Sequence, residues 1–263
     1  MYVTLIALAA LWGAATGLLV PRAAYRLSVE PDEPWRDTCP AGHPFTGAAR
    51  GWLGRARCAT CTTSVPAGRP LTTTTTAEPP TRTPVLVPLL TALASAALAA
   101  ATGPRPELAV WLLATPFAVL LATVDRRVHR LPDQLTLPLA AAAPLLLGAA
   151  ELLPGEAGSW PTALLGGLAL GAGYFVLFLI NPNGLGFGDV KLALSLGVTL
   201  GWYGWSILFL GAFAGFLFGS LYGLTLVLLR RAGRKSAIPF GPFMIAGAFA
   251  GLLLGAFAAS PTP

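Results

Sequence analysis

Long apolar runs separated by short polar connections dominate the sequence. A helix needs about 20 residues to cross the hydrocarbon core of a bilayer, and roughly 17–25 is the usual range. Most of the runs reach this length, and the run that follows Asp189 is the shortest. The pattern predicts an all-α polytopic membrane protein with about eight transmembrane helices, over residues 1–20, 85–102, 107–124, 135–150, 163–180, 190–201, 205–229 and 243–259.

The first apolar run is predicted to be a retained helix. It has no basic segment before it and no small-residue cleavage site after it, so it does not resemble a removed signal peptide. A polar stretch rich in Pro, Gly and Arg follows, and its end, LTTTTTAEPPTRTP, has the composition of a disordered linker. We expect a first transmembrane helix at 1–20, a cytoplasmic loop at 21–84 and a seven-helix membrane domain at 85–263.

Small residues recur inside the predicted spans, for example in GGLALGAG (166–173) and GAFAGFLFG (211–219). Glycine and alanine allow helix backbones to approach closely in a bilayer. These runs therefore predict close helix packing.

Composition and charge agree with a membrane protein. The chain has 263 residues, of which 55% are hydrophobic and 11% are charged, whereas a soluble domain carries roughly 25% charged residues. The net charge of +6 is not gathered into one long patch, so no nucleic-acid partner is expected. Of the 17 Lys and Arg residues, only Arg105 lies in a connection that follows an even-numbered span. Because cytoplasmic loops collect Lys and Arg, we expect both termini outside, with the lipid bilayer and its anionic headgroups as a partner.

Three acidic residues lie next to apolar runs on the predicted inner side: Asp125, Asp133 and Asp189. Ionisable groups in such places are costly and are candidates for function. The other acidic residues fall in polar connections, where solvation explains them. Asp133 precedes the fourth span, at a position typical of a helix N-cap. For Asp125, the structural alternative is an ion pair with Arg126 or Arg130.

Two glycines, Gly186 and Gly188, come just before Asp189 in the sequence GFGD. They indicate a sharply bent or closely approached backbone, although Asp189 could also be the N-cap of the run after it. Two aspartates from different spans on one side of a membrane suggest an acid–base pair. One carboxyl group would hold a proton while the other activates water.

Three stretches resemble the prepilin peptidases, or type IV leader peptidases, which are GxGD-class aspartic intramembrane proteases. VDRRVHRLPDQLTLPL (124–139) is similar to the first aspartate segment of the family, GLGFGDVKLALSLG (184–197) to the second, and SAIPFGPFMIAG (236–247) to the start of its last span. The resemblance implies a membrane peptidase domain in which Asp125 and Asp189 are the catalytic pair. It implies supporting roles for Gly186, Gly188 and Asp133, and we expect Lys191 only to anchor its span at the interface.

The same resemblance implies a multi-pass enzyme of the bacterial cytoplasmic membrane. Its expected partners are pilin or pseudopilin precursors, from which it cuts the short leader without a cofactor. Some family members also methylate the new N-terminus with S-adenosylmethionine, but no residue of this chain indicates that activity.

The loop at 21–84 holds all three cysteines of the chain. Many family members carry two CxxC pairs in this loop. Here CPAGH supplies Cys39 and His43, and CATC supplies Cys58 and Cys61. These side chains are the ligand types of a tetrahedral zinc site, and a reducing cytoplasm disfavours a disulfide. The alternative is a decayed site that binds no metal.

Three other functions compete with a prepilin peptidase. An inert membrane component of pilus assembly or secretion would share the scaffold but would not need both aspartates. A transporter would need polar groups near the middle of the membrane, where these spans have almost none. A presenilin-like protease would share the GxGD motif but not the other two segments.

Overall fold

A computed structural model describes residues 2–30, 33–53, 61, 83–182, 184–229 and 238–259. Within these ranges the fold is helical, and the one β-type pairing is an isolated bridge between Thr38 and Pro44. Apolar sequences without a period of two favour helices, because a membrane helix satisfies its own backbone hydrogen bonds. The helices are α1 Tyr2–Gly17, α2 Val20–Leu27, α3 Ala48–Gly51, α5 Thr83–Thr102, α6 Glu107–Val128, α7 Asp133–Glu151, α8 Trp160–Ile180, α9 Phe187–Gly201, α10 Trp205–Leu228 and α11 Gly241–Ala258.

The polytopic all-α fold is confirmed. In the described ranges, seven helical stretches are long and apolar enough to cross a membrane, with α1 and α2 together counting as one. The remaining expected span is α9, which has 15 residues and is therefore only about 22 Å long. It nevertheless packs inside the bundle, against α7, α8, α10 and α11.

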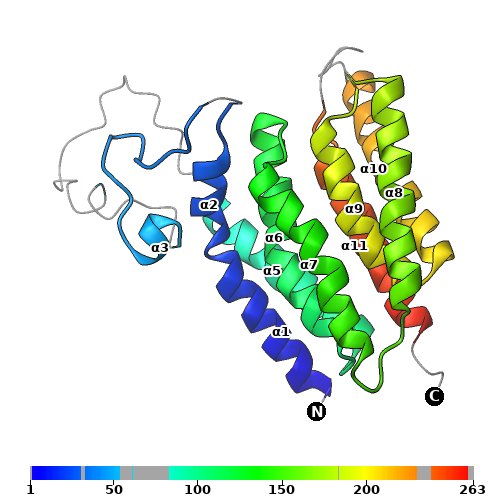
Figure 1. Cartoon of the computed structure of the whole chain (residues 1–263). Helices are drawn as coiled ribbons and strands as arrows, with labels where there is room; N and C mark the ends of the chain where they lie inside the picture. Colours follow the sequence, from blue (N-terminus) through cyan, green and yellow to red (C-terminus); the bar gives the residue numbers. More distant parts are fainter. Residues whose placement is uncertain are drawn as a thin grey trace.

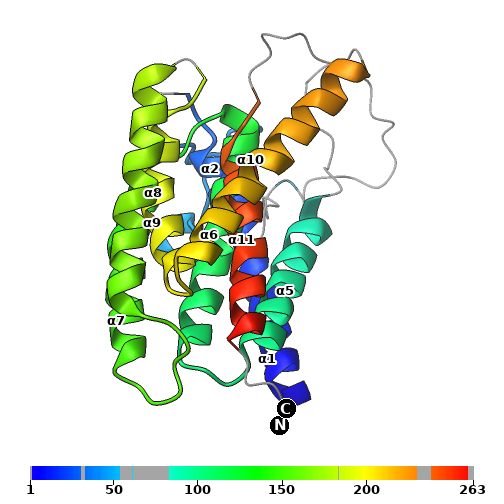
Figure 2. The same ribbon diagram turned by 90° about the vertical axis from the view of Figure 1, so that its right-hand side faces the viewer.

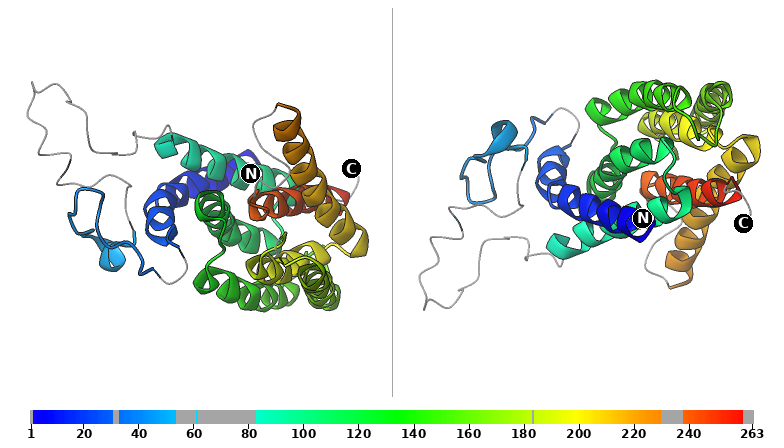
Figure 3. Two further views of the ribbon diagram at one scale, coloured as in Figure 1. Left: turned by 90° about the horizontal axis from the view of Figure 1, so that it is seen from above. Right: turned by 90° about the horizontal axis from the view of Figure 1, so that it is seen from below.

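Successive long helices run in opposite directions, so the start of α1 and the end of α11 lie at one end of the bundle (Figures 1 and 2). We call this the terminal end. The last turn of α6 and the first turns of α7, α9 and α11 lie at the other end, which we call the aspartate end because it holds Asp125 and Asp189. In the view from above, α1 and α2 lie on one side of the bundle and α10 on the other, with α11 between them (Figure 3).

The predicted loop at 21–84 begins with a helix instead. In α2, Arg22 and Arg26 are 9% and 7% exposed, although the sequence analysis placed them in a polar loop. Their guanidinium groups lie over the rings of Phe45 and Trp52, at 5.1 and 4.0 Å from the ring centroids. Cation–π contact of this kind, together with hydrogen bonds to backbone carbonyls, compensates the buried charges. The segment around α3 is thereby attached to α2.

Close packing at glycines is confirmed. Helices α8 and α9 meet at Gly166 and Gly197, where a Cβ added to Gly166 would lie 2.7 Å from the carbonyl oxygen of Gly197. A Cβ on Gly201 would lie 3.1 Å from the Cα of Gly166. Any larger side chain at these positions would push α9 away from α8, so the glycines fix the position of the short helix that carries Asp189.

Candidate active site

Asp125 lies in the last turn of α6, at the end of the predicted third span. The helix ends only at His129, a left-handed C-cap whose N–H donates to the carbonyl of Asp125 at 2.8 Å. The Asp125 side chain is 4% exposed, and its Oδ2 accepts the backbone N–H of Gly241 at 3.0 Å. Arg126 and Arg130 are exposed, and neither forms an ion pair with Asp125 within the described ranges. The carboxylate therefore faces the start of α11.

Asp189 is the third residue of α9 and is 8% exposed. It is not the N-cap, because Gly186 occupies that position. Its Oδ2 accepts the backbone N–H of Gly186 at 3.0 Å. A carboxylate in the first turn of a helix is stabilised by the helix dipole and by N–H groups that lack a partner within the helix. Local backbone thus fixes the orientation of this carboxylate.

Leu131 connects the surroundings of the two aspartates. It is 6% exposed and lies in the turn between α6 and α7. A Cβ on Gly188 would lie 2.9 Å from the Cβ of Leu131, and a Cβ on Gly241 would lie 3.5 Å from its Cδ2. Gly188 is therefore closely approached, as expected, whereas Gly186 has an ordinary extended conformation with φ −75°.

The two carboxylates lie close enough for their charges to interact. They come from α6 and α9, which the chain separates by α7 and α8. Two buried carboxyl groups at short range cannot both ionise without a large cost, so they tend to share a single proton. Such a pair can supply a general acid and a general base together.

Asp133 does not cap α7, contrary to our prediction. Pro132 is the N-cap residue and no side chain caps this helix. The Asp133 carboxylate instead accepts a hydrogen bond from Lys191 Nζ at 2.6 Å. The expectation that Lys191 only anchors its span is therefore wrong, because this side chain joins the first turn of α7 to α9. Asp133 is 54% exposed and Lys191 is 17% exposed, measured on the side chains.

Three of the four expected metal ligands converge. The ligand atoms of Cys39, His43 and Cys61 all lie within 4.8 Å of one another. Cys39 Sγ is 3.7 Å from both His43 Nδ1 and Cys61 Sγ, and His43 Nδ1 is 3.3 Å from Cys61 Sγ. Zinc bonds of about 2.3 Å to sulfur and 2.1 Å to nitrogen place tetrahedral ligands roughly 3.5–3.8 Å apart. The three side chains fit such an ion, and the fourth expected ligand, Cys58, lies outside the described residues.

A tight turn brings Cys39 and His43 together. The Cys39 N–H donates to the His43 carbonyl at 2.9 Å, and the Gly42 N–H donates to the Cys39 carbonyl at 2.8 Å. Gly42 has φ +81°, a left-handed conformation that glycine adopts without strain. The sequence CPAGH therefore folds locally into a shape that turns two ligands toward one point.

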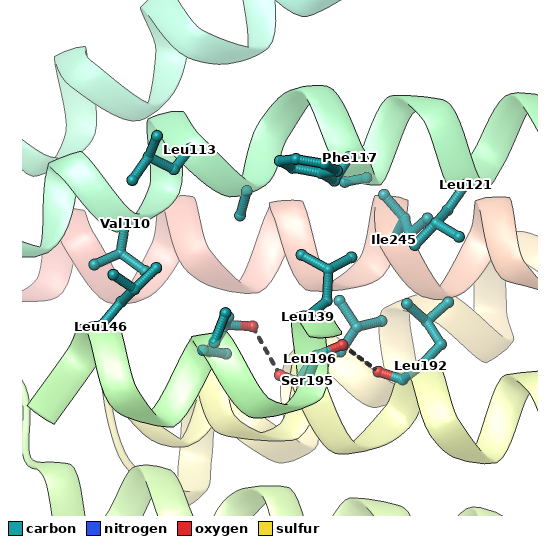
Figure 4. Close-up of a pocket in the computed structure, with 15 residues that line it drawn as sticks. Val110, Leu113, Phe117, Leu121, Leu139, Leu146, Leu192, Ser195, Leu196 and Ile245 are labelled. Carbon is teal, nitrogen blue, oxygen red and sulfur yellow. Dashed lines mark hydrogen bonds between the residues drawn. The ribbon is translucent and has the colours of Figure 1, made fainter. Parts of the chain in front are cut away.

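An apolar cavity of about 240 Å³ lies beside the aspartates, deeper in the bundle. Leu121, four residues before Asp125, and Leu192, three residues after Asp189, line it. Figure 4 shows Leu113 and Phe117 of α6 facing Leu139 of α7 and Leu196 of α9 across this space. The site thus has carboxylates at the end of the bundle and an apolar interior next to them.

Two features of the site were not predicted from the sequence. Gly241 was quoted only as part of a family segment, although its N–H holds Asp125. The partner of Lys191 was missed because Asp133 lies 58 residues away in the chain. The one local signal was that both residues sit beside predicted inner ends of spans, where charges of opposite sign can meet.

Comparison with known proteins places these residues in context. Residues 112–257 match the type IV leader peptidase family, and this stretch contains both aspartates. The chain is 35% identical to the prepilin leader peptidase/N-methyltransferase of Aeromonas hydrophila, over 84% of this chain and 72% of that protein. It is 31% identical to the protein of the same name from Burkholderia pseudomallei, over 84% of this chain and 67% of that protein. No solved structure matches the chain.

Proposed function

Since the chain belongs to the type IV leader peptidase family, we infer that it is a prepilin peptidase in which Asp125 and Asp189 form an aspartic pair. The observation that carries this inference is the convergence of two buried carboxylates, each held by a backbone N–H, at one end of a membrane bundle. An inert assembly component would have no use for two buried acids at this cost. The substrate would be a pilin-like precursor with a short basic leader before an apolar helix.

The reaction is peptide hydrolysis by one protonated and one ionised carboxyl group. The ionised group takes a proton from a water molecule while the water oxygen attacks the scissile carbonyl carbon. The protonated group donates its proton to the carbonyl oxygen. When the resulting diol collapses, the C–N bond breaks, the leaving amine takes the proton that the first group had removed from water, and a diol hydroxyl returns a proton to the second group. Both carboxyl groups thus return to their starting states together with the released products.

The position of the pair suits this substrate. The aspartates lie at the end of the bundle, next to the apolar cavity under Leu121 and Leu192. The precursor changes from a polar leader to an apolar helix at its cleavage site. The enzyme changes from polar to apolar surroundings at the aspartates, so the two would match when the substrate binds. The basic connections at this end support its placement at the cytoplasmic face of a bacterial membrane.

We also propose that Cys39, His43 and Cys61 hold zinc, with Cys58 as the fourth ligand. The ion would have a structural role in the segment attached to α2, because four protein ligands leave no open position for catalysis. Peptide cleavage would not use this ion, since the aspartates supply both acid and base. The relatives' names include an N-methyltransferase, and that activity in this chain would require S-adenosylmethionine.

The peptidase is tested with purified protein in liposomes and a purified precursor that carries a basic leader before an apolar helix. We expect the wild type to release the leader, and Asp125→Asn and Asp189→Asn each to abolish release at equal protein amounts. The exposed Asp37 provides a matched control, and Asp37→Asn should cleave normally. Mass spectrometry of the product with S-adenosylmethionine present tests methylation in the same assay. Cleavage by either site variant at a rate near that of the wild type would disprove the aspartic pair.

A further inference from the structure

The two helices that carry the aspartates do not pack directly against each other. Among the described helices, α6 contacts α7 and α11, and α9 contacts the same two, but α6 and α9 share no backbone contact. The apolar cavity lies between them, with α7 and α11 on either side (Figure 4). The spacing of α6 and α9 is therefore set through α7 and α11 and through any side chains that join the two helices directly.

A buried polar cluster joins the two helices at the terminal end. Glu107 is the first residue of α6 and is 0% exposed. Tyr203 follows the end of α9, and its hydroxyl donates to Glu107 Oε1 at 3.4 Å. The Nε1 of Trp111, one turn further along α6, donates to the Tyr203 hydroxyl at 3.3 Å. The cluster thus links the start of α6 to the end of α9.

The cluster is also attached to α11. Arg105 Nε lies 3.5 Å from Glu107 Oε1, and Arg105 Nη2 donates to the carbonyl of Ala256 at 2.7 Å. Gly255 leaves room for the tyrosine, because a Cβ there would lie 2.7 Å from Tyr203 Cγ. Three helix ends therefore meet around one phenol.

The burial of Glu107 requires an explanation. A buried carboxylate is costly unless it is paired and hydrogen-bonded, and this one lies far from the aspartates, where it can take no part in cleavage. Burial, and then the charge of Glu107, raise the pKa of Tyr203 to about 12. The phenol therefore keeps its proton at neutral pH and remains a hydrogen-bond donor to the carboxylate.

We propose that Glu107, Trp111 and Tyr203 are positioning residues that set the separation of Asp125 and Asp189 from the opposite end of the bundle. From Glu107 to Asp125 the helix is about 27 Å long, so a tilt of roughly 2° at the cluster moves Asp125 by about 1 Å. With an apolar cavity rather than packed backbone between α6 and α9, the cluster adds a direct link between two helices that are otherwise held through their neighbours α7 and α11. The proposal rests on the aspartic pair of the proposed function.

The experiment compares Tyr203→Phe and Glu107→Gln with wild type in the liposome cleavage assay. Tyr203→Phe keeps the ring and removes the hydroxyl, and Glu107→Gln keeps the shape and removes the charge. We expect kcat to fall by about tenfold or more, since a displacement of 1 Å can cost up to about 100-fold, while KM stays unchanged. Interaction between the two carboxyl groups separates their apparent pKa values, and this gap sets the width of the bell-shaped pH profile of kcat. If the carboxyl groups move apart, the interaction weakens and the profile should become narrower.

Trp160→Phe is the matched control. Trp160 Nε1 donates to the carbonyl of Pro144 at 2.8 Å, and this hydrogen bond joins α8 to α7. It should lower thermal stability as much as Tyr203→Phe does, while the pH profile stays that of the wild type. Gly255→Ala is a second test of the cluster. It displaces the ring of Tyr203 but does not remove the hydroxyl group, and it should also narrow the pH profile of kcat.

The outcomes separate the two proposals. If Asp125→Asn and Asp189→Asn abolish cleavage but Tyr203→Phe, Glu107→Gln and Gly255→Ala match Trp160→Phe in kcat and pH profile, the cluster is only structural and the inference is wrong. If the aspartate variants still cleave, the proposed function has failed before the cluster is tested.

Discussion

Gly241 donates its backbone N–H to Oδ2 of Asp125 at 3.0 Å across 116 residues of sequence. Gly241 is the first residue of α11, so the positive end of that helix faces the carboxylate. A Cβ added to Gly241 would lie 2.8 Å from the same oxygen. The hydrogen bond therefore requires the absence of a side chain.

Gly241→Ala tests this relationship. The substitution keeps the N–H and adds only a methyl group, so it moves the carboxylate without changing the chemistry of the pair. We expect kcat for precursor cleavage to fall by roughly 10- to 100-fold, with similar protein levels. Gly173→Ala in α8 is the control, because nothing lies within 4 Å of a Cβ at that position, and it should cleave at the wild-type rate. Equal activity of the two variants would contradict the role given to Gly241.

Asp133→Asn tests the ion pair with Lys191. Because the Asp133 side chain is half exposed, the pair contributes at most about 1 kcal/mol to stability, which corresponds to a Tm change of roughly 2–4 °C. We expect a decrease of that size and a partial loss of activity, less than about tenfold. The double variant Asp133→Lys with Lys191→Asp should recover part of the lost Tm and part of the lost activity. A complete loss of cleavage with an unchanged Tm would instead give Asp133 a direct part in the reaction.

The fold and the two aspartates were predictable because each depends on local sequence. Runs of about 20 apolar residues specify membrane helices, and the acidic residues stand out against them. The contact of Asp125 with Gly241 and that of Asp133 with Lys191 were not predictable, since both form through tertiary packing of distant segments. Glu107 stands at the start of the predicted span 107–124, beside an external connection where solvation would explain it, and only the packing of α6 against Tyr203 reveals its burial. Helix α9 begins three residues before the predicted run at 190–201, because Asp189 and the glycines before it interrupt the apolar pattern.

Zinc content tests the cluster of Cys39, His43 and Cys61. Freshly purified protein should contain about one zinc ion per chain by elemental analysis, and Cys61→Ser and His43→Ala should each reduce it strongly. The chain has two histidines, so His129→Ala is a matched control that should retain the ion. Leader cleavage by Cys61→Ser should continue at a rate near that of the wild type. Absence of zinc from wild-type protein prepared without chelators would mean that the site has lost its metal.

The direction of the chain across the membrane depends on whether α9 crosses it. At about 22 Å this helix is shorter than the roughly 30 Å hydrocarbon core, yet Tyr203, just after its end, reaches Glu107 at the start of α6. Seven helices, α5 to α11, then separate the loop at 21–84 from the C-terminus, and an odd number of crossings places these two on opposite sides. The basic residues of the loop predict that it lies in the cytoplasm.

Reporter fusions test this arrangement. An enzyme that is active only outside the cytoplasm should be inactive when fused after Thr83 and active when fused after Pro263, and a cytoplasmic fluorescent reporter should show the reverse. A fusion in the connection at Gly155, an exposed position between α7 and α8, should behave like the fusion after Pro263. If the fusion after Pro263 instead reports the same side as the fusion after Thr83, and the opposite side from the fusion at Gly155, then α9 does not cross the membrane. In that case Asp189 would enter the site from a re-entrant helix, and the even number of spans would be wrong.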